Sequence, residues 1–302
     1  MHLRLATRKS PLALVQARLA AAALQKAHRD MEVELVPITS QGDTISGRLA
    51  DHGGKELFVH ALQQAMRAGQ ADAACHSLKD VGADSDEFVL AAFLPRGPAA
   101  DALIGKSLAE LEVMDAPRIG TSSPRRTGLI KSLLPGAQPV EIRGNVGTRI
   151  EKIAAGKIDA LLLAAAGLHR LNLQASIAQV LPCATFVPAP GQGIIALECQ
   201  RAKGSIAGLL AAVSDPETGA AALAERAVAA RVAGDCHTPL AAHATVVNGQ
   251  VQTTCLLTAP DGSALARAQG LAEQPQQSGR QAAEQMLDAG GRQILAQINA
   301  GG

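Results

Sequence analysis

Arginine residues recur where a predicted strand passes into a helix. These residues are Arg8, Arg125, Arg126, Arg143 and Arg149. In a doubly wound sheet such turns lie at the carboxyl ends of the strands, so their side chains share one edge. Helix N-termini offer free N–H groups, and guanidinium groups offer paired donors that match carboxylates. The pattern predicts a site for a ligand with several negative charges, although each arginine alone could be a solvated or ion-paired surface residue.

Asp80 follows a short apolar strand within the run His76-Ser77-Leu78-Lys79-Asp80, so it belongs to the same edge. A carboxylate among cations can be neutralised in an ion pair. It can also stabilise a cationic intermediate or move protons beside an anionic substrate. The sequence leaves both interpretations open.

Cys236 lies on a predicted turn between Asp235 and His237. A lone cysteine is usually a small buried hydrophobe, whereas an exposed turn with a neighbouring histidine favours a reactive thiol. The chain has five cysteines, widely scattered and without C-x-x-C spacing. Neither a disulfide framework nor a metal site is therefore expected.

The composition narrows the class of protein. The 302 residues include 28 basic and 27 acidic side chains, which argues against a nucleic-acid partner. The longest apolar run, 160–168, is about half of a membrane span, and the N-terminus has no apolar core of signal-peptide length. We expect a cytoplasmic protein with no membrane partner and with reduced thiols.

The elements that position these residues alternate between strands and helices, which indicates α/β units with a mostly parallel sheet. Strands are expected over 3–5, 33–38, 71–75, 88–94, 101–104, 118–120, 140–142, 158–164, 244–247 and 251–257. Helices are expected over 11–28, 57–65, from 124, over 148–155 and 216–232, and near 276–298. Ser followed by Pro marks two of the helix starts.

Two segments rich in Pro and Gly interrupt this rhythm, at 95–98 and 187–191. They suggest a chain that leaves a first domain and later returns to it, and two ordinary surface loops are the alternative. A cleft between two such lobes is a usual place for a ligand. We expect domain 1 over 1–95 and 190–213, domain 2 over 99–187, and a smaller α+β domain 3 over 216–302.

Taken in order, the motifs resemble the porphobilinogen deaminase (hydroxymethylbilane synthase) family. The matching segments are Ala6–Leu14, Gly53-Gly54-Lys55, His76–Val81, Gly120–Ser123 before Arg125-Arg126, Arg143–Arg149, Ala165–Leu168 with Arg170-Leu171, Gly191-Gln192-Gly193, and Cys236 before Pro239. Each motif is modest alone, but the ordered set is specific and spans the chain from about residue 3 to the C-terminal helix.

The resemblance implies an α/β fold with two doubly wound domains like those of periplasmic binding proteins, plus the smaller α+β domain. It implies a monomeric transferase that adds four porphobilinogen units to a dipyrromethane cofactor, with loss of ammonia, and releases the linear tetrapyrrole by hydrolysis. The cofactor would be held by a thioether to Cys236, and Asp80 would be the catalytic aspartate. A thioether survives a reducing cytosol, where a disulfide would not.

The resemblance also assigns residues that hold cofactor and substrate. They are Arg8, Lys55, Ser77, Lys79, Thr121, Ser122, Ser123, Arg125, Arg126, Arg143, Gly144, Arg149, Arg170 and Gln192. Gln16 and Phe58 match as well, with less defined roles. Each pyrrole carries two carboxylates, which agrees with the arginine pattern.

Three departures from the family pattern concern loops: Glu56 replaces Gly, Gly82 replaces Pro, and Asp235 replaces Gly. None removes a residue assigned to chemistry. Two rivals remain: a non-catalytic module that binds anions or effectors on a two-lobed fold, and a paralogue that carries cofactor without turnover. The first gives Cys236 no role.

Overall fold

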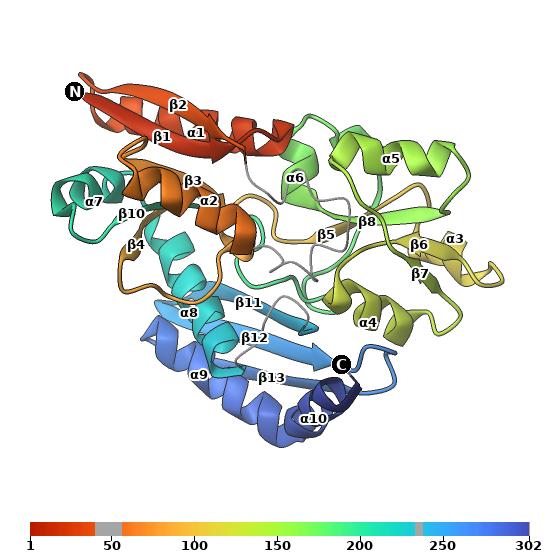
Figure 1. Ribbon diagram of the computed structural model, residues 1–302. Helices are drawn as coiled ribbons and strands as arrows, with labels where there is room; N and C mark the ends of the chain where they lie inside the picture. Colours follow the sequence, from red (N-terminus) through yellow and green to blue (C-terminus); the bar gives the residue numbers. More distant parts are fainter. Residues whose placement is uncertain (40–55, 233–237, 302) are drawn as a thin grey trace. The chain divides into compact units, whose positions relative to one another are not determined.

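The computed structural model describes residues 1–39, 56–232 and 238–301 (Figure 1). Two compact units are present within these residues. The first comprises Met1–Gly97 with Gly193–Ala222, and the second comprises Pro98–Gln192 with Leu223–Gly302. Each five-stranded sheet belongs to one unit, and the second unit also holds a three-stranded sheet.

The first unit is built on a sheet of order β2-β1-β3-β10-β4. Its strands are β1 (His2–Arg8), β2 (Glu32–Ile38), β3 (Ala73–Ser77), β4 (Phe88–Phe93) and β10 (Ile195–Gln200). Its helices are α1 (Pro11–Ala27), α2 (Glu56–Arg67) and α7 (Gly204–Ala211), with a 3-10 turn at Leu78–Asp80. Strand β1 runs parallel to β2 and β3, whereas β10 runs antiparallel to β3 and β4.

Alternation along the strands buries both faces of this sheet. In β1, Leu3 and Leu5 pack in one cluster with Ala17 and Leu24 of α1, whereas Ala6 packs in another with residues of α2. A strand with a period of two can bury both faces only when helices cover both. The first unit therefore has the three-layer form of an α/β fold.

The N-terminus of α1 forms for the reason expected from the sequence. Ser10 is the N-cap, and its hydroxyl accepts a hydrogen bond from Ala13 N at 3.3 Å. Pro11 occupies the first helical position, where a missing N–H costs nothing. This turn brings Arg8, at the end of β1, to the start of the helix.

The second unit contains a sheet of order β7-β6-β8-β5-β9. Its strands are β5 (Asp101–Ile104), β6 (Arg118–Gly120), β7 (Gln138–Val140), β8 (Ala160–Ala164) and β9 (Ile177–Val180). The helices here are α3 (Leu108–Glu112), α4 (Pro124–Leu133), α5 (Val146–Ala154) and α6 (Ala165–Arg170). This part confirms the second α/β domain of the predicted fold class.

A separate antiparallel sheet, β11-β12-β13, forms the smaller α+β part. The strands are β11 (Leu240–Val247), β12 (Gln250–Thr258) and β13 (Leu265–Ala272), and the helices are α8 (Pro216–Val232), α9 (Pro275–Met286) and α10 (Arg292–Gly301). The core between them includes Val228, Cys255, Ala282 and Met286. Two expectations were wrong here: β13 was not predicted, and the C-terminal helix is interrupted where Gly290 has φ +108°.

The expectation of mostly parallel sheets was also wrong. In each five-stranded sheet, two of the four strand pairs are antiparallel. The strands responsible are β10 and β5, and each is the first strand after the chain passes from one unit to the other. A helical crossover makes neighbouring strands parallel only when it connects them within one sheet. A strand that arrives from the other unit is free of that constraint.

Candidate active site

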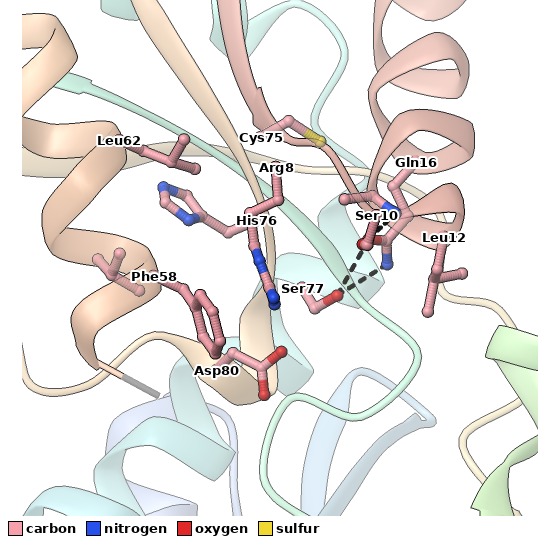
Figure 2. Close-up of a pocket in the computed structure, with 12 residues that line it drawn as sticks. Arg8, Ser10, Leu12, Gln16, Phe58, Leu62, Cys75, His76, Ser77 and Asp80 are labelled. Carbon is pink, nitrogen blue, oxygen red and sulfur yellow. Dashed lines mark hydrogen bonds between the residues drawn. The ribbon is translucent and has the colours of Figure 1, made fainter. Parts of the chain in front are cut away.

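A pocket in the first unit gathers residues from the carboxyl ends of β1 and β3 and from the starts of α1 and α2 (Figure 2). Its lining residues are Arg8, Ser10, Leu12, Ala13, Gln16, Phe58, Val59, Leu62, Cys75, His76, Ser77 and Asp80. Three of the residues predicted for the site, Arg8, Ser77 and Asp80, therefore share one pocket. Lys79 belongs to the same 3-10 turn but is not among the lining residues.

Asp80 is held at the pocket by a short rigid turn. Leu78 is buried and anchors the 3-10 turn in a core cluster with Phe93 and Ile194. Its backbone N–H donates to Ile194 O at 3.0 Å, and Val81 N donates to Leu78 O at 3.0 Å. These bonds leave the side chain of Asp80 half-buried at the end of a buried strand.

The guanidinium of Arg8 packs over an aromatic ring inside this pocket. Its Cζ lies 3.4 Å from the centroid of the Phe58 ring, a cation–π contact. Figure 2 shows the side chains of Arg8, Phe58 and Asp80 gathered in one part of the pocket. A positive group, a ring face and a carboxylate therefore converge at one place.

Ser77 and Gln16 form a second polar pair in the pocket. The Gln16 amide donates to Ser77 Oγ at 2.9 Å, and Ser77 Oγ donates to Gln16 Oε1 at 3.0 Å. Gln16 is buried, so this exchange fixes its amide against the end of β3.

A buried polar chain that sequence reasoning missed lies behind the pocket. His76 Nε2 lies 2.9 Å from Glu198 Oε2, and Gln63 Nε2 donates to Glu198 Oε1 at 2.9 Å. Both His76 and Glu198 have side chains only 4% exposed. The sequence held one signal for it, an acidic residue inside the apolar run 194–199, because such a residue is rarely buried without a partner.

In the second unit, Arg125 and Arg126 are buried around the carboxylate of Asp101. Asp101 accepts from Arg125 Nη2 at 2.8 Å and from Arg126 Nε and Nη2 at 2.9 and 2.6 Å. Gln192 Nε2 donates to the same carboxylate at 3.1 Å and to Ala99 O at 2.7 Å. The structure thus brings together three residues predicted for the site, with an aspartate that was not predicted.

The electrostatics of this cluster favour ionisation of its acid. Burial alone would raise the pKa of Asp101, but the charges and hydrogen bonds of Arg125 and Arg126 outweigh it and lower the pKa to about 2. Burial in turn lowers the pKa of Arg125. Two guanidinium groups share one carboxylate, so a net positive charge remains. Arg125 Nε is buried and has no hydrogen-bond partner among the described residues.

The remaining predicted residues of this unit line the turns after β6, β7 and β8. Ser122 Oγ donates to Ile142 O at 2.6 Å, and Ser123 is the N-cap of α4. Thr121 is buried before them, and Arg170, at the end of α6, is half-buried. Thr121, Ser122 and Ser123 follow the carboxyl end of β6, whereas Arg170 lies one short helix beyond the end of β8.

Two partly exposed arginines flank the start of α5, Arg143 before the helix and Arg149 in its first turns. Arg143 Nε donates to Glu141 Oε1 at 3.1 Å, and Arg149 Nε donates to Gly144 O at 2.8 Å. Gly144 has φ +108°, and a Cβ there would lie 3.0 Å from Thr148. Both the positive φ and this close contact favour glycine at position 144.

Lys55 and Cys236 lie outside the described residues. The four cysteines that are described, Cys75, Cys183, Cys199 and Cys255, form no disulfide with one another. Within the described ranges, no group of three or more His, Cys, Asp or Glu side chains could hold a metal ion. The same ranges contain no helix long and apolar enough to span a membrane.

Known protein families and relatives match most of the chain. Residues 3–207 match the family described as "Porphobilinogen deaminase, dipyromethane cofactor binding domain", and residues 220–288 match "Porphobilinogen deaminase, C-terminal domain". A porphobilinogen deaminase of Xanthomonas euvesicatoria pv. vesicatoria is 43% identical over 301 residues, which cover 98% of this chain and 99% of the relative. One from Coxiella burnetii is 41% identical over 297 residues, 97% of this chain and 96% of the relative.

Solved structures give a weaker likeness. A TRAP periplasmic solute binding protein of Desulfovibrio salexigens has a TM-score of 0.43 at 15% identity, covering 71% of this chain and 72% of its own. One from Pseudomonas putida has a TM-score of 0.40 at 12% identity, with 71% and 77% covered. At such scores the fold assignment depends on the sheets and helices described above.

Proposed function

Because the chain belongs to the porphobilinogen deaminase family, we propose how its residues carry out the reaction of a hydroxymethylbilane synthase. This enzyme is a transferase that joins porphobilinogen units onto a dipyrromethane cofactor. In each addition the C–N bond of the substrate's aminomethyl group breaks, a C–C bond forms, and the proton lost from the pyrrole leaves with ammonia. The observation that carries the assignment is the match to both family domains, over 3–207 and 220–288.

Asp80 is the catalytic residue of this proposal. The substrate becomes positively charged as ammonia leaves, and a carboxylate already held at that point lowers the barrier without having to reorient. Asp80 is half-buried, stands on a short hydrogen-bonded turn and lines the same pocket as Arg8 and Phe58 (Figure 2). These features support an electrostatic role at the reacting carbon.

Arginines hold the acidic side chains of cofactor and substrate. We assign this to Arg8, Arg125, Arg126, Arg143, Arg149 and Arg170, with further contacts from Lys55, Ser77, Lys79, Thr121, Ser122, Ser123, Gly144 and Gln192. Arg125 and Arg126 already bind Asp101. Because one carboxylate balances only one of their two positive charges, the other charge remains to attract a carboxylate of the ligand. The orphaned Nε of Arg125 supports the same assignment.

The residues present fit the dipyrromethane cofactor. Its acidic side chains need several cationic donors, and the described turns supply them. When bound, the cofactor supplies the pyrrole carbon to which the first substrate unit is joined. Cys236 would hold it by a thioether, and this assignment rests on the sequence motif alone.

The domain boundaries, the location and the oligomeric state of the protein are part of the proposal. We assign domain 1 to 1–95 and 190–213, domain 2 to 99–187 and domain 3 to 216–302. The lack of a disulfide among the four described cysteines supports a reducing, cytoplasmic location, and the balanced charge supports a protein without a nucleic-acid partner. Light scattering during gel filtration tests the proposed monomer.

Intact mass spectrometry tests the function most directly. Protein purified from cells that make tetrapyrroles should be heavier than its sequence by one dipyrromethane unit, and Cys236→Ser should lack that increment. Incubation with porphobilinogen should release ammonia and hydroxymethylbilane. An unmodified mass without an Ehrlich colour would indicate the anion-binding module, and a loaded protein that releases no ammonia would indicate the inactive paralogue.

A further inference from the structure

A buried acid with no assigned role lies one layer behind the pocket. Glu198 is on β10, and its carboxylate is held by His76 of β3 and Gln63 of α2. All three side chains lie between the sheet and α2, because Glu198 is paired with Ala74 and His76 with Ala196 along the same face. The chain therefore links both strands to the helix that carries Phe58.

Joining a helix to a sheet through such a polar chain requires polar groups to be buried, which is unfavourable in free energy. Burying a carboxylate is unfavourable unless hydrogen bonds compensate, and packed apolar residues of similar volume often stabilise a fold as well or better. What a hydrogen-bonded chain adds is one defined orientation for each of its members. His76 is the member of the chain that lines the pocket, so the chain can fix the orientation of its imidazole there.

We propose that Glu198 is a positioning residue for the Asp80 site and acts through His76. An ionised carboxylate only accepts, so it fixes the proton of His76 on Nε2 and leaves Nδ1 as the acceptor when the ring is neutral. The ring then keeps one orientation in the pocket that Phe58 and Leu62 of α2 also line. The ring of Phe58 in turn packs against the guanidinium of Arg8.

Loss of this positioning should affect the chemical step of the reaction rather than the stability of the protein. If the ring of His76 turns or changes tautomer, the pocket that it lines together with Phe58 and Arg8 changes shape around Asp80. Substrate affinity depends on the arginines as a set, whereas the chemical step depends on this local geometry. The proposal rests on the function proposed above and predicts an effect on kcat that exceeds the effect on KM.

Glu198→Gln separates positioning from packing. The new amide has the same shape, and its oxygen can still accept from Gln63, but its NH2 donates to His76 Nε2 and reverses the tautomer. We expect kcat to fall by about 10- to 100-fold, the range found for residues that orient metal-binding histidines, with KM within about twofold. Glu87→Gln is the matched control, since Glu87 is 44% exposed and binds only the surface residue Arg67 among the described ion pairs.

Two measurements decide the proposal. Histidine 15N NMR of the cofactor-free protein, assigned by the signal lost in His76→Gln, should show Nε2–H in the wild type and Nδ1–H in Glu198→Gln. In a His76→Gln background, Glu198→Gln should cause no further loss of kcat, because a residue that acts through another has no independent effect. Unchanged kcat, an unchanged tautomer or multiplying effects would overturn it. A wild type that makes no hydroxymethylbilane would refute the proposed function, while the NMR result would still decide the tautomer.

Discussion

Replacement of Asp101 by Asn should destabilise the protein far more than the loss of any surface acid. Asp101 is fully buried and accepts hydrogen bonds from two arginines and a glutamine. Asn has nearly the same shape but no charge, so Arg125 and Arg126 would be left buried without a counter-ion. The perturbation therefore tests whether this cluster is an electrostatic unit.

The size of the effect follows from the ionisation of the acid. Lowering the pKa of Asp101 from 3.8 to about 2 corresponds to about 2 kcal/mol in favour of the charged form. Removing one partner of a buried ion pair typically costs about 3–5 kcal/mol, because the other charge remains buried. We expect Asp101→Asn to lose about 3 kcal/mol of unfolding free energy at pH 7.

The pH dependence has a defined sign. A folded-state pKa below the unfolded value means that the stabilisation is complete above about pH 4 and declines as the pH falls toward 2. The difference between wild type and Asp101→Asn should therefore be constant from pH 7 to about pH 5 and shrink below pH 4.

Urea unfolding followed by far-UV circular dichroism measures this, since the chain has no Trp or Tyr for intrinsic fluorescence. Asp159→Asn is the control, because Asp159 pairs with the 42% exposed Arg118 and should cost less than about 1 kcal/mol. Equal losses for the two variants, or a difference that does not change with pH, would refute the reasoning.

Three further predictions concern the site and the core. Asp80→Asn should lower the rate of hydroxymethylbilane formation by about 10²–10³-fold without changing the thermal midpoint, and wild-type turnover would exclude the role given to Asp80. Burial raises the pKa of Cys255 to about 12, so its thiol should resist iodoacetamide at pH 8 in the native protein and react in urea, as peptide mass mapping would show. Gly270→Ala would place a Cβ 2.2 Å from Ser278 O, and we expect about 3 kcal/mol of destabilisation by urea unfolding, whereas Gly249→Ala, in open space, reports the cost of the turn alone.

The fold class and most elements could be predicted because local signals agree with the global structure. Ser10 with Pro11 and Ser123 with Pro124 begin helices as expected, and the strand at 101–104 has the predicted bounds. Strand direction could not be predicted, because spacing carries no information on which way a strand runs. The strand at 265–272 was missed because Ala and Gly face the core there and produce a weak alternation.

The site was predicted from residues at turns, and the parts that were missed are partners from distant segments. Asp101 was expected only as the start of a strand, yet it accepts from arginines more than twenty residues away. Glu198 and His76 are 122 residues apart. Pairings of this kind arise from tertiary contacts, and a single sequence shows only that each residue is polar in an apolar context.

The order of strands in the first sheet has a consequence for synthesis on the ribosome. Strand β10 lies between β3 and β4, so β4 has no partner in this sheet until residue 200 has emerged. The second five-stranded sheet uses only residues 101–180 and is complete before then. N-terminal domains usually fold first during synthesis, but here the N-terminal sheet must finish second, with the edge of β3 open in the meantime. The residues around Asp80 therefore acquire their final surroundings only after a later part of the chain has folded.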